Sequence, residues 1–192
     1  MAPLSSRFEE ALLFAARLHA EQARKGSGVP YVSHLLAVCS LVLEFGGDEE
    51  QAIAGLLHDA IEDQGGDAAR QQIRERFGER VAALVDGCSD TDIIPKPPWR
   101  QRKEAYLEHL RHAPADVRLV SGADKLHNLR TLLTDYRQQG EKVWERFRGG
   151  KEGSLWYARE TTSIFLTAGP LTVGQEMQEA LADLEALVAQ QG

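Results

Sequence analysis

Apolar residues recur at intervals of three and four along almost the whole chain, and no segment alternates strictly between apolar and polar residues. This spacing is typical of amphipathic α-helices, each of which turns one apolar face toward a core. Clusters of glycine and proline interrupt the pattern at short intervals, which marks the connections between helices. We therefore predict an all-α fold, built as one compact bundle of about 9–10 helices.

The predicted helices lie between these breaks. We expect them over residues 6–23, 31–45, 48–64, 67–77, 79–86, 100–112, 116–139, a short stretch around Trp144, 154–167 and 172–190. Three predicted starts carry capping-box pairs, Ser6 with Glu9, Asp48 with Gln51 and Thr172 with Gln175. Residues 87–98 hold three of the seven prolines and are predicted to form a loop.

A length of 192 residues suits one core, so we expect residues 1–192 to form a single domain. No apolar run approaches the roughly 20 residues of a membrane helix, and the first residues lack the apolar centre of a signal peptide. Cys39 lies in an apolar run and is expected to be a buried free thiol, although one disulfide with Cys88 stays open. These features place the chain in a reducing cytoplasm.

The formal net charge of −7 and the lack of a basic cluster argue against a broad nucleic-acid surface. We expect neither nucleic acid nor a membrane as a partner. A small anionic ligand held by a few local cations remains compatible with this charge. The sequence leaves the oligomeric state open.

Four ionisable residues, His58, Asp59, Glu62 and Asp63, interrupt an otherwise apolar predicted helix. Burying them without compensation would cost several kcal/mol each. Helical spacing places His58 over Glu62 and Asp59 over Asp63, so an imidazole and three carboxylates would share one region of space. A divalent cation would relieve their mutual repulsion. The alternative is that Glu62 and Asp63 only begin a solvated turn before Gly65.

A second polar pattern lies on the long predicted helix 116–139. Asp124, Asn128 and Thr131 are spaced to form a polar stripe beside an apolar one. On a central helix such a stripe indicates a lined cavity. The alternative is that Asn128 and Thr131 only bind surface water.

Four blocks in this order resemble HD-domain metal-dependent phosphohydrolases, and more narrowly the hydrolase domain of RelA/SpoT proteins. The blocks are Arg24-Lys25, Pro30 to His34, His58 to Asp63 and Ala123 to Thr131. Without a synthetase or regulatory region, the chain is similar to the stand-alone small alarmone hydrolases, of the metazoan SpoT-homologue type. The resemblance implies a helical 3′-pyrophosphohydrolase that converts guanosine tetra- or pentaphosphate, (p)ppGpp, to GDP or GTP.

The resemblance also implies roles for single residues. His34, His58, Asp59 and Asp124 would bind one metal ion, usually Mn²⁺ in this family, and their nitrogen and oxygen donors also suit Fe²⁺ or Zn²⁺. Glu62 and Asp63 would orient or activate the attacking water. The expected substrate contacts are Arg24, Lys25, Asn128 and Thr131 near the nucleoside, and Trp144, Arg148 and Lys103 or Arg102 near the phosphates.

The sequence departs in three places from the pattern that the resemblance implies. Leu35 and Gln64 replace a proline and a threonine, and Ser121-Gly122 replaces a common Lys-Leu pair beside Asp124. The last change could alter substrate choice. Alternative functions are therefore an NADPH 2′-phosphatase, a hydrolase of adenosine alarmones, or a nucleotide-binding sensor without catalysis.

Overall fold

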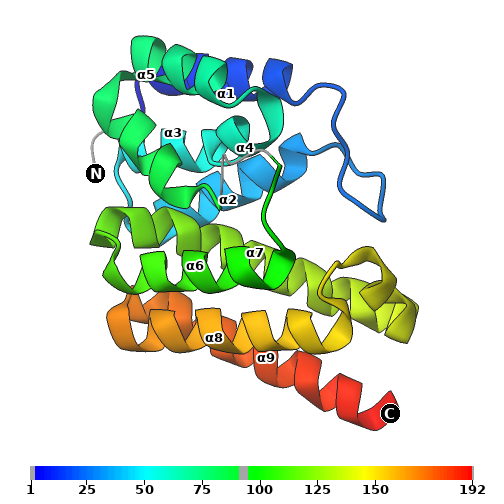
Figure 1. The fold of residues 1–192 in the computed structure, drawn as a ribbon. Coiled ribbons are helices and arrows are strands. Elements are labelled where there is room, and N and C mark those ends of the chain that lie inside the picture. Colours follow the sequence, from blue (N-terminus) through cyan, green and yellow to red (C-terminus); the bar gives the residue numbers. More distant parts are fainter. Residues whose placement is uncertain (1–2, 91–94, 192) are drawn as a thin grey trace.

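The computed structural model describes residues 3–90 and 95–191, and in these residues it contains nine α-helices, one 3-10 helix and no strand (Figure 1). This confirms the predicted all-α class. The elements are α1 (Ser6–Leu18), α2 (Val32–Glu44), α3 (Glu49–Leu57), α4 (Ala60–Gln64), α5 (Asp67–Cys88), α6 (Trp99–His112), α7 (Ala115–Gln139), η1 (Gly140–Arg146), α8 (Gly150–Ala168) and α9 (Leu171–Gln191).

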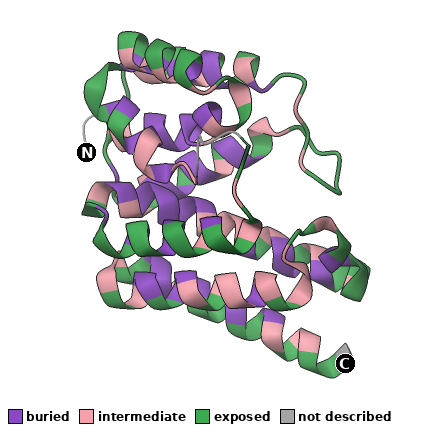
Figure 2. Ribbon diagram, viewed as in Figure 1, coloured by how far each residue is buried: buried purple, intermediate pink, exposed green. Residues whose placement is uncertain are grey.

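Helix α7 organises the bundle. It crosses the middle of the molecule, with α1 to α5 on one side and α8 and α9 on the other (Figure 1). It packs against α2, α3, α5, α9 and η1. Buried residues lie on the faces that neighbouring helices turn toward each other (Figure 2). Residues carried by α7 therefore lie close to segments that are far away in the sequence. None of the described helices combines the length and apolarity that a membrane crossing requires.

The predicted continuous helix over residues 48–64 is wrong, because the structure ends α3 at Leu57 and begins α4 at Ala60. His58 Nδ1 lies 2.8 Å from the carbonyl oxygen of Gly55, and the imidazole occupies an acceptor that a continuing helix would use. His58 and Asp59 consequently sit at a junction between two helices, where both side chains can leave the helix surface in the same direction.

Several local expectations are confirmed and others are corrected. Gly78 has a φ of 87° and interrupts α5, so the two predicted segments 67–77 and 79–86 correspond to the two halves of this kinked helix. The Asp48 capping box is present, with Gln51 as its partner.

Helix α1 is capped by Ser5 instead of Ser6, and it ends at Leu18, before the predicted residue 23. In the predicted loop 87–98, residues 91–94 lie outside the described residues. Both cysteines are buried and free.

Two of the family departures have packing explanations. Leu35 is fully buried on α2, where it adds to the core. A Cβ atom on Gly122 would lie 2.9 Å from Val173 Cγ1 and 3.0 Å from Phe165 Cε1. Glycine at this position therefore lets α8 and α9 approach α7 closely. Next to it, the Tyr106 hydroxyl donates to Ser121 Oγ over 3.2 Å, inside the core.

We expect Gly122→Leu, which restores the common residue of the family, to destabilise this chain. Inserting a larger side chain into a packed core costs about 1–3 kcal/mol, more than the roughly 0.5–1 kcal/mol gained by removing glycine from a helix. Each kcal/mol corresponds to a melting temperature lower by about 2–4 °C in a chain of this size. Thermal unfolding measures the effect, with Ala16→Leu on the exposed face of α1 as the control. A Gly122→Leu protein that melts at or above the wild-type temperature would contradict the packing explanation.

Candidate metal centre and active site

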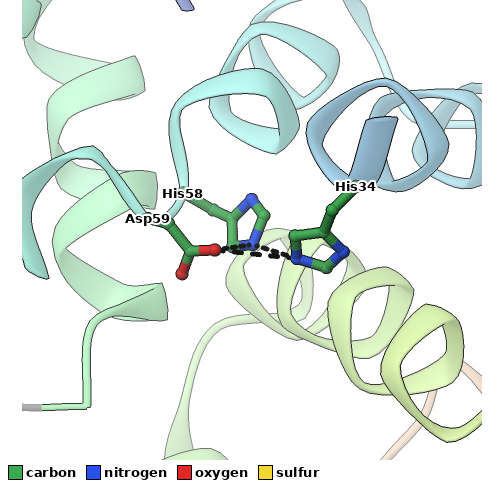
Figure 3. A group of neighbouring side chains, drawn as sticks. All are labelled: His34, His58 and Asp59. Carbon is green, nitrogen blue, oxygen red and sulfur yellow. Dashed lines mark hydrogen bonds and ion pairs between the residues drawn. The ribbon is translucent and has the colours of Figure 1, made fainter. Parts of the chain in front are cut away.

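Four potential metal ligands from three parts of the chain meet at the centre of the bundle. His34 comes from α2, His58 and Asp59 from the junction between α3 and α4, and Asp124 from α7. His58 Nε2 lies 3.0 Å from Asp59 Oδ2 and 3.2 Å from His34 Nε2 (Figure 3). It also lies 3.5 Å from Asp124 Oδ1. His34 Nε2 lies 3.2 Å from Asp124 Oδ1 and 3.6 Å from Asp59 Oδ2.

These separations match donor atoms that share one ion, because ligands about 2.0–2.2 Å from a metal lie roughly 3–3.5 Å from one another. The atoms of His34, His58 and Asp59 all lie within 4.8 Å of one another. Asp124 joins them through its close approach to both imidazoles. The structure thus brings together the four residues that the sequence analysis proposed as ligands.

The electrostatics of this cluster favour a positive charge between the carboxylates. His34, His58 and Asp124 are almost fully buried. Burial opposes the charged form of Asp59, but the neighbouring His58 and His34 imidazoles outweigh it and hold the pKa of Asp59 well below its ordinary range. Burial likewise opposes a charge on His58, yet Asp59 and Asp124 raise the pKa of His58 well above its usual value. A divalent cation bound by neutral imidazoles would supply the same compensation.

The hydrogen bonds behind the imidazoles direct their Nε2 atoms toward the cluster. His58 Nδ1–H donates to the Gly55 carbonyl, which leaves the lone pair of Nε2 free to bind a metal. His34 Nδ1 lies 2.7 Å from His127 Nδ1, so one of these two nitrogens must donate. Burial, with the nearby charges of His34 and Arg24, lowers the pKa of His127 to about 4. A neutral His127 can accept from His34, and the donor set then fits a divalent metal ion.

His127 and Tyr31 are residues of the site that the sequence analysis did not identify. The spacing of His127, three residues after Asp124 on the same helix, was an available signal because such residues share a helix face. The Tyr31 hydroxyl donates to Asp59 Oδ2 over 2.5 Å. Burial and the charge of Asp59 raise the pKa of Tyr31, so this hydroxyl keeps its proton. Tyr31 precedes α2, and only the packed structure brings it to Asp59.

A chain of polar contacts connects Asp124 to Arg24. Asn128 Nδ2 donates to Asp124 Oδ1 over 2.5 Å, and Arg24 Nη2 donates to Asn128 Oδ1 over 2.9 Å. On the other side of the carboxylate, Lys125 Nζ lies 2.6 Å from Asp124 Oδ2 and 4.8 Å from the Tyr106 ring centroid. Lys125, which was not singled out from the sequence, places a partly buried cation beside Asp124. The two predicted substrate contacts Arg24 and Asn128 therefore lie next to the ligand cluster.

Asp63 lies one helical turn after Asp59, since its backbone N–H donates to the Asp59 carbonyl over 3.0 Å. The side chains of Glu62 and Asp63 pair with residues outside the ligand cluster. Glu62 Oε1 forms an ion pair with Lys96 Nζ over 2.9 Å, and Asp63 Oδ2 accepts from Gln22 Nε2 over 2.7 Å. Asp63 also borders an open groove of about 440 Å³, lined by Arg17, Leu18, Glu21, Gln22, Asp63 and Gln64. Catalytic roles for Glu62 and Asp63 stay predictions.

The other predicted substrate contacts differ in their partners and in their exposure. Lys103 Nζ lies 2.8 Å from Asp90 Oδ2, and the buried Arg102 pairs with the same oxygen over 2.5 Å. Thr131 Oγ1 donates to the backbone oxygen of His127 over 2.8 Å. The side chains of Lys25 and Arg148 are exposed. Substrate contacts by these residues stay predictions.

Trp144 was expected on the phosphate side of the site, but it is buried in the core, with its ring centroid 5.5 Å from that of Tyr136. The neighbouring Arg146 reaches the loop of Arg24 and Lys25, where it donates to the Lys25 carbonyl over 3.3 Å. It also forms an ion pair with Asp135 over 2.7 Å. Arg146 thus supports this loop, a role that the sequence analysis assigned to no residue.

Comparisons with known proteins agree with this geometry. Residues 11–155 match the family model described as HD domain. The protein of Xenopus tropicalis named guanosine-3′,5′-bis(diphosphate) 3′-pyrophosphohydrolase MESH1 is 35% identical over 148 residues, which cover 74% of this chain and 80% of that protein. A solved structure described as "A metazoan ortholog of SpoT hydrolyzes ppGpp and plays a role in starvation responses" aligns over 100% of this chain and 99% of its own, with a TM-score of 0.74 and 26% identity.

A longer relative also matches. The Synechocystis protein named probable guanosine-3′,5′-bis(diphosphate) 3′-pyrophosphohydrolase is 41% identical over 128 residues, or 64% of this chain. The match covers only 16% of that relative, and the chain spans less than a fifth of the length of such bacterial relatives. The similarity therefore concerns one domain of these larger proteins.

We expect His58→Ala to lose its divalent metal, because removing one of four donors also leaves Asp59 and Asp124 with His34 as their remaining imidazole neighbour in the cluster. Metal content after gel filtration, measured by elemental analysis, tests this expectation. His112→Ala is the matched control, since the His112 side chain is 77% exposed and pairs only with Glu108 on its own helix among the described contacts. A His58→Ala protein that keeps the metal content of the His112→Ala protein would exclude this cluster as the metal centre.

Proposed function

The chain belongs to the HD-domain family, among the MESH1/SpoT-type hydrolases, and on this premise we propose that it removes pyrophosphate from the 3′ position of (p)ppGpp, giving GDP or GTP. The observation that carries the proposal is the convergence of His34, His58, Asp59 and Asp124 on one point, with Arg24 and Asn128 beside them. The first group suits a metal-assisted attack on phosphorus, and the second suits the binding of a nucleoside next to it.

We propose Mn²⁺ as the ion, held by these four residues. When bound, it would lower the pKa of a water molecule and polarise a phosphoryl oxygen. In the proposed reaction the water oxygen bonds to the phosphorus attached to the 3′ oxygen, and the bond from that phosphorus to the 3′ oxygen breaks. The ribose oxygen takes up a proton and pyrophosphate leaves.

The residues of this chain have distinct tasks in the proposal. Asp63 accepts a proton from the attacking water, and Glu62 helps to orient that water. Arg24 stacks on the purine and donates hydrogen bonds, supported by Asn128. The cationic side chains near the site, Lys25, Lys96 and Lys103, offset the negative charge of the phosphates.

Turnover of a nucleotide panel by the manganese-loaded protein tests the proposed function. We expect release of pyrophosphate, and no inorganic phosphate, from guanosine tetraphosphate. Release of phosphate from NADPH, or turnover of adenosine alarmones alone, would show that (p)ppGpp is not the substrate and that one of these alternatives is. Binding of guanosine tetraphosphate without turnover would instead indicate a sensor.

Asp63→Asn and Glu62→Gln should each lower kcat by about 10²–10⁴-fold, the usual contribution of general acid–base groups, while metal content stays at the wild-type level. Steady-state kinetics and elemental analysis measure the two quantities. Asp183→Asn, at a side chain that is 62% exposed on α9, is the control. Loss of metal together with activity would show that the carboxylates are ligands and that their proposed roles are wrong.

Arg24→Lys should raise KM for guanosine tetraphosphate roughly tenfold with a smaller change in kcat, since it removes binding worth about 1.4 kcal/mol in the ground state and the transition state alike. Lysine keeps the charge but cannot stack on a purine or form the same fork of hydrogen bonds. Arg159→Lys on the exposed face of α8 is the control. An unchanged KM in Arg24→Lys would remove Arg24 from the nucleoside site.

A further inference from the structure

We propose that Gln22 is a positioning residue for Asp63, holding one oxygen of its carboxylate so that the other can take the proton of the attacking water. The inference rests on the proposed function, because it concerns the group that acts as the base. Gln22 lies in the segment between α1 and α2, 41 positions before Asp63. Its Nε2 donates to Asp63 Oδ2 over 2.7 Å.

Two further hydrogen bonds fix the orientation of the Gln22 amide. Its Oε1 accepts from Gln64 Nε2 and from His19 Nδ1, each over 2.6 Å. Because both donors approach the oxygen, the amide nitrogen must face Asp63. The reversed amide would place two nitrogen donors against each other and an oxygen against the carboxylate. The position of Gln22 is therefore set by its neighbours as well as by Asp63.

The support behind Gln22 is buried and tied to the metal centre. His19 is 2% exposed, and its ring stacks on Tyr31 with centroids 5.4 Å apart. Tyr31 in turn donates to the potential metal ligand Asp59. The Gln22 backbone is held at both ends, since its carbonyl accepts from Tyr31 N over 2.8 Å and its N–H donates to the His19 carbonyl over 3.0 Å. Asp63 is thereby fixed relative to Asp59 by a continuous set of contacts.

This arrangement explains the remaining departure from the family pattern, which is Gln64. Gln64 stands where the resemblance leads us to expect threonine, and its longer amide reaches Gln22 Oε1. A threonine hydroxyl at this position is shorter by two heavy atoms and would not span the same separation without a shift of α4. Gln64 thus supplies the second donor that selects one orientation of the Gln22 amide.

The charges around Asp63 make the bond from Gln22 important for its protonation. Asp63 is exposed, its Oδ2 accepts from the Gln22 amide, and Asp59 and Glu62 place further negative charge near it. The charged and titratable groups that face or border Asp63 are Asp59, Glu62, Lys96, Tyr31, Arg17, Glu21 and, through Gln22, His19. Gln22 is the neutral donor in this set, and it stabilises the ionised form that a base requires.

Gln22→Glu is the sharpest test, since glutamate keeps an oxygen to accept from His19 and Gln64 but presents a second oxygen in place of the donor to Asp63. We expect kcat to fall roughly ten- to hundred-fold at pH 7, with KM and metal content near wild-type values. A base is active only when ionised, so a raised pKa of Asp63 removes activity at a higher pH. The acid limb of the kcat profile should therefore move up by about one pH unit. Gln22→Met, which loses the donor without adding charge, should shift the limb less and in the same direction.

Two controls separate positioning from a general structural effect. Gln178→Glu, at an exposed position of α9, should leave kcat and the acid limb of the kcat profile unchanged. In the Asp63→Asn background, Gln22→Glu should cause no further loss of kcat, because the group that Gln22 positions is already absent. A Gln22→Glu protein with the kcat and acid limb of Gln178→Glu, or an additive loss in the double variant, would overturn the proposal.

A titration by ¹³C NMR of the Asp63 carboxyl carbon keeps the proposal separate from the proposed function. Its pKa should be higher in Gln22→Glu than in the wild-type protein, whether or not pyrophosphate is released. An unchanged carboxyl titration would overturn the role of Gln22. If the Asp63 titration shifts in Gln22→Glu while the wild-type protein does not turn over (p)ppGpp, the contact is supported and the proposed substrate is rejected.

Discussion

The structure depends on one electrostatic constraint, the placement of a buried carboxylate, Asp124, and a partly buried one, Asp59, beside two buried imidazoles at the centre of the bundle. Asp59 and Asp124 both approach His58 Nε2 within 3.5 Å. Such a cluster is unfavourable unless a positive charge lies between the acids. The constraint explains why so many buried polar contacts in this molecule point to the same place.

The helices are arranged so that this cluster can form. The break between α3 and α4 lets two consecutive residues, His58 and Asp59, face the same point. The length of α7 brings Asp124 under α2 and α3, and Gly122 permits the close packing of α8 and α9 on the opposite side. Lys125 adds a partly buried cation against Asp124. The same few residues therefore determine both how the helices pack and how the charges of the cluster are compensated.

The segment between α1 and α2 connects the cluster to the surrounding groups. It brings Gln22 to Asp63, Arg24 to Asn128, and Tyr31 to Asp59. A bridge between Ala23 and Pro30 closes this segment on itself, and the backbone N–H of Arg24 donates to the Val29 carbonyl over 2.8 Å. One short connection thus links the proposed proton acceptor, the proposed nucleoside contact and the candidate metal centre. A loop held at this many points can place side chains as firmly as a helix.

The sequence by itself determined the all-α class, most helix boundaries and the break at Gly78, because periodicity, caps and glycine act through neighbours in the chain. The residues of the candidate metal centre followed from the family resemblance of four sequence blocks. Only the tertiary structure decided which side chains contact each other. It paired Glu62 with Lys96 and Asp63 with Gln22, placed His127 behind His34, and buried Trp144. These contacts join residues that are up to about a hundred positions apart, as in the 104 positions between Arg24 and Asn128. Which side chains meet over such a separation depends on how the helices pack, and local spacing carries no information about that packing.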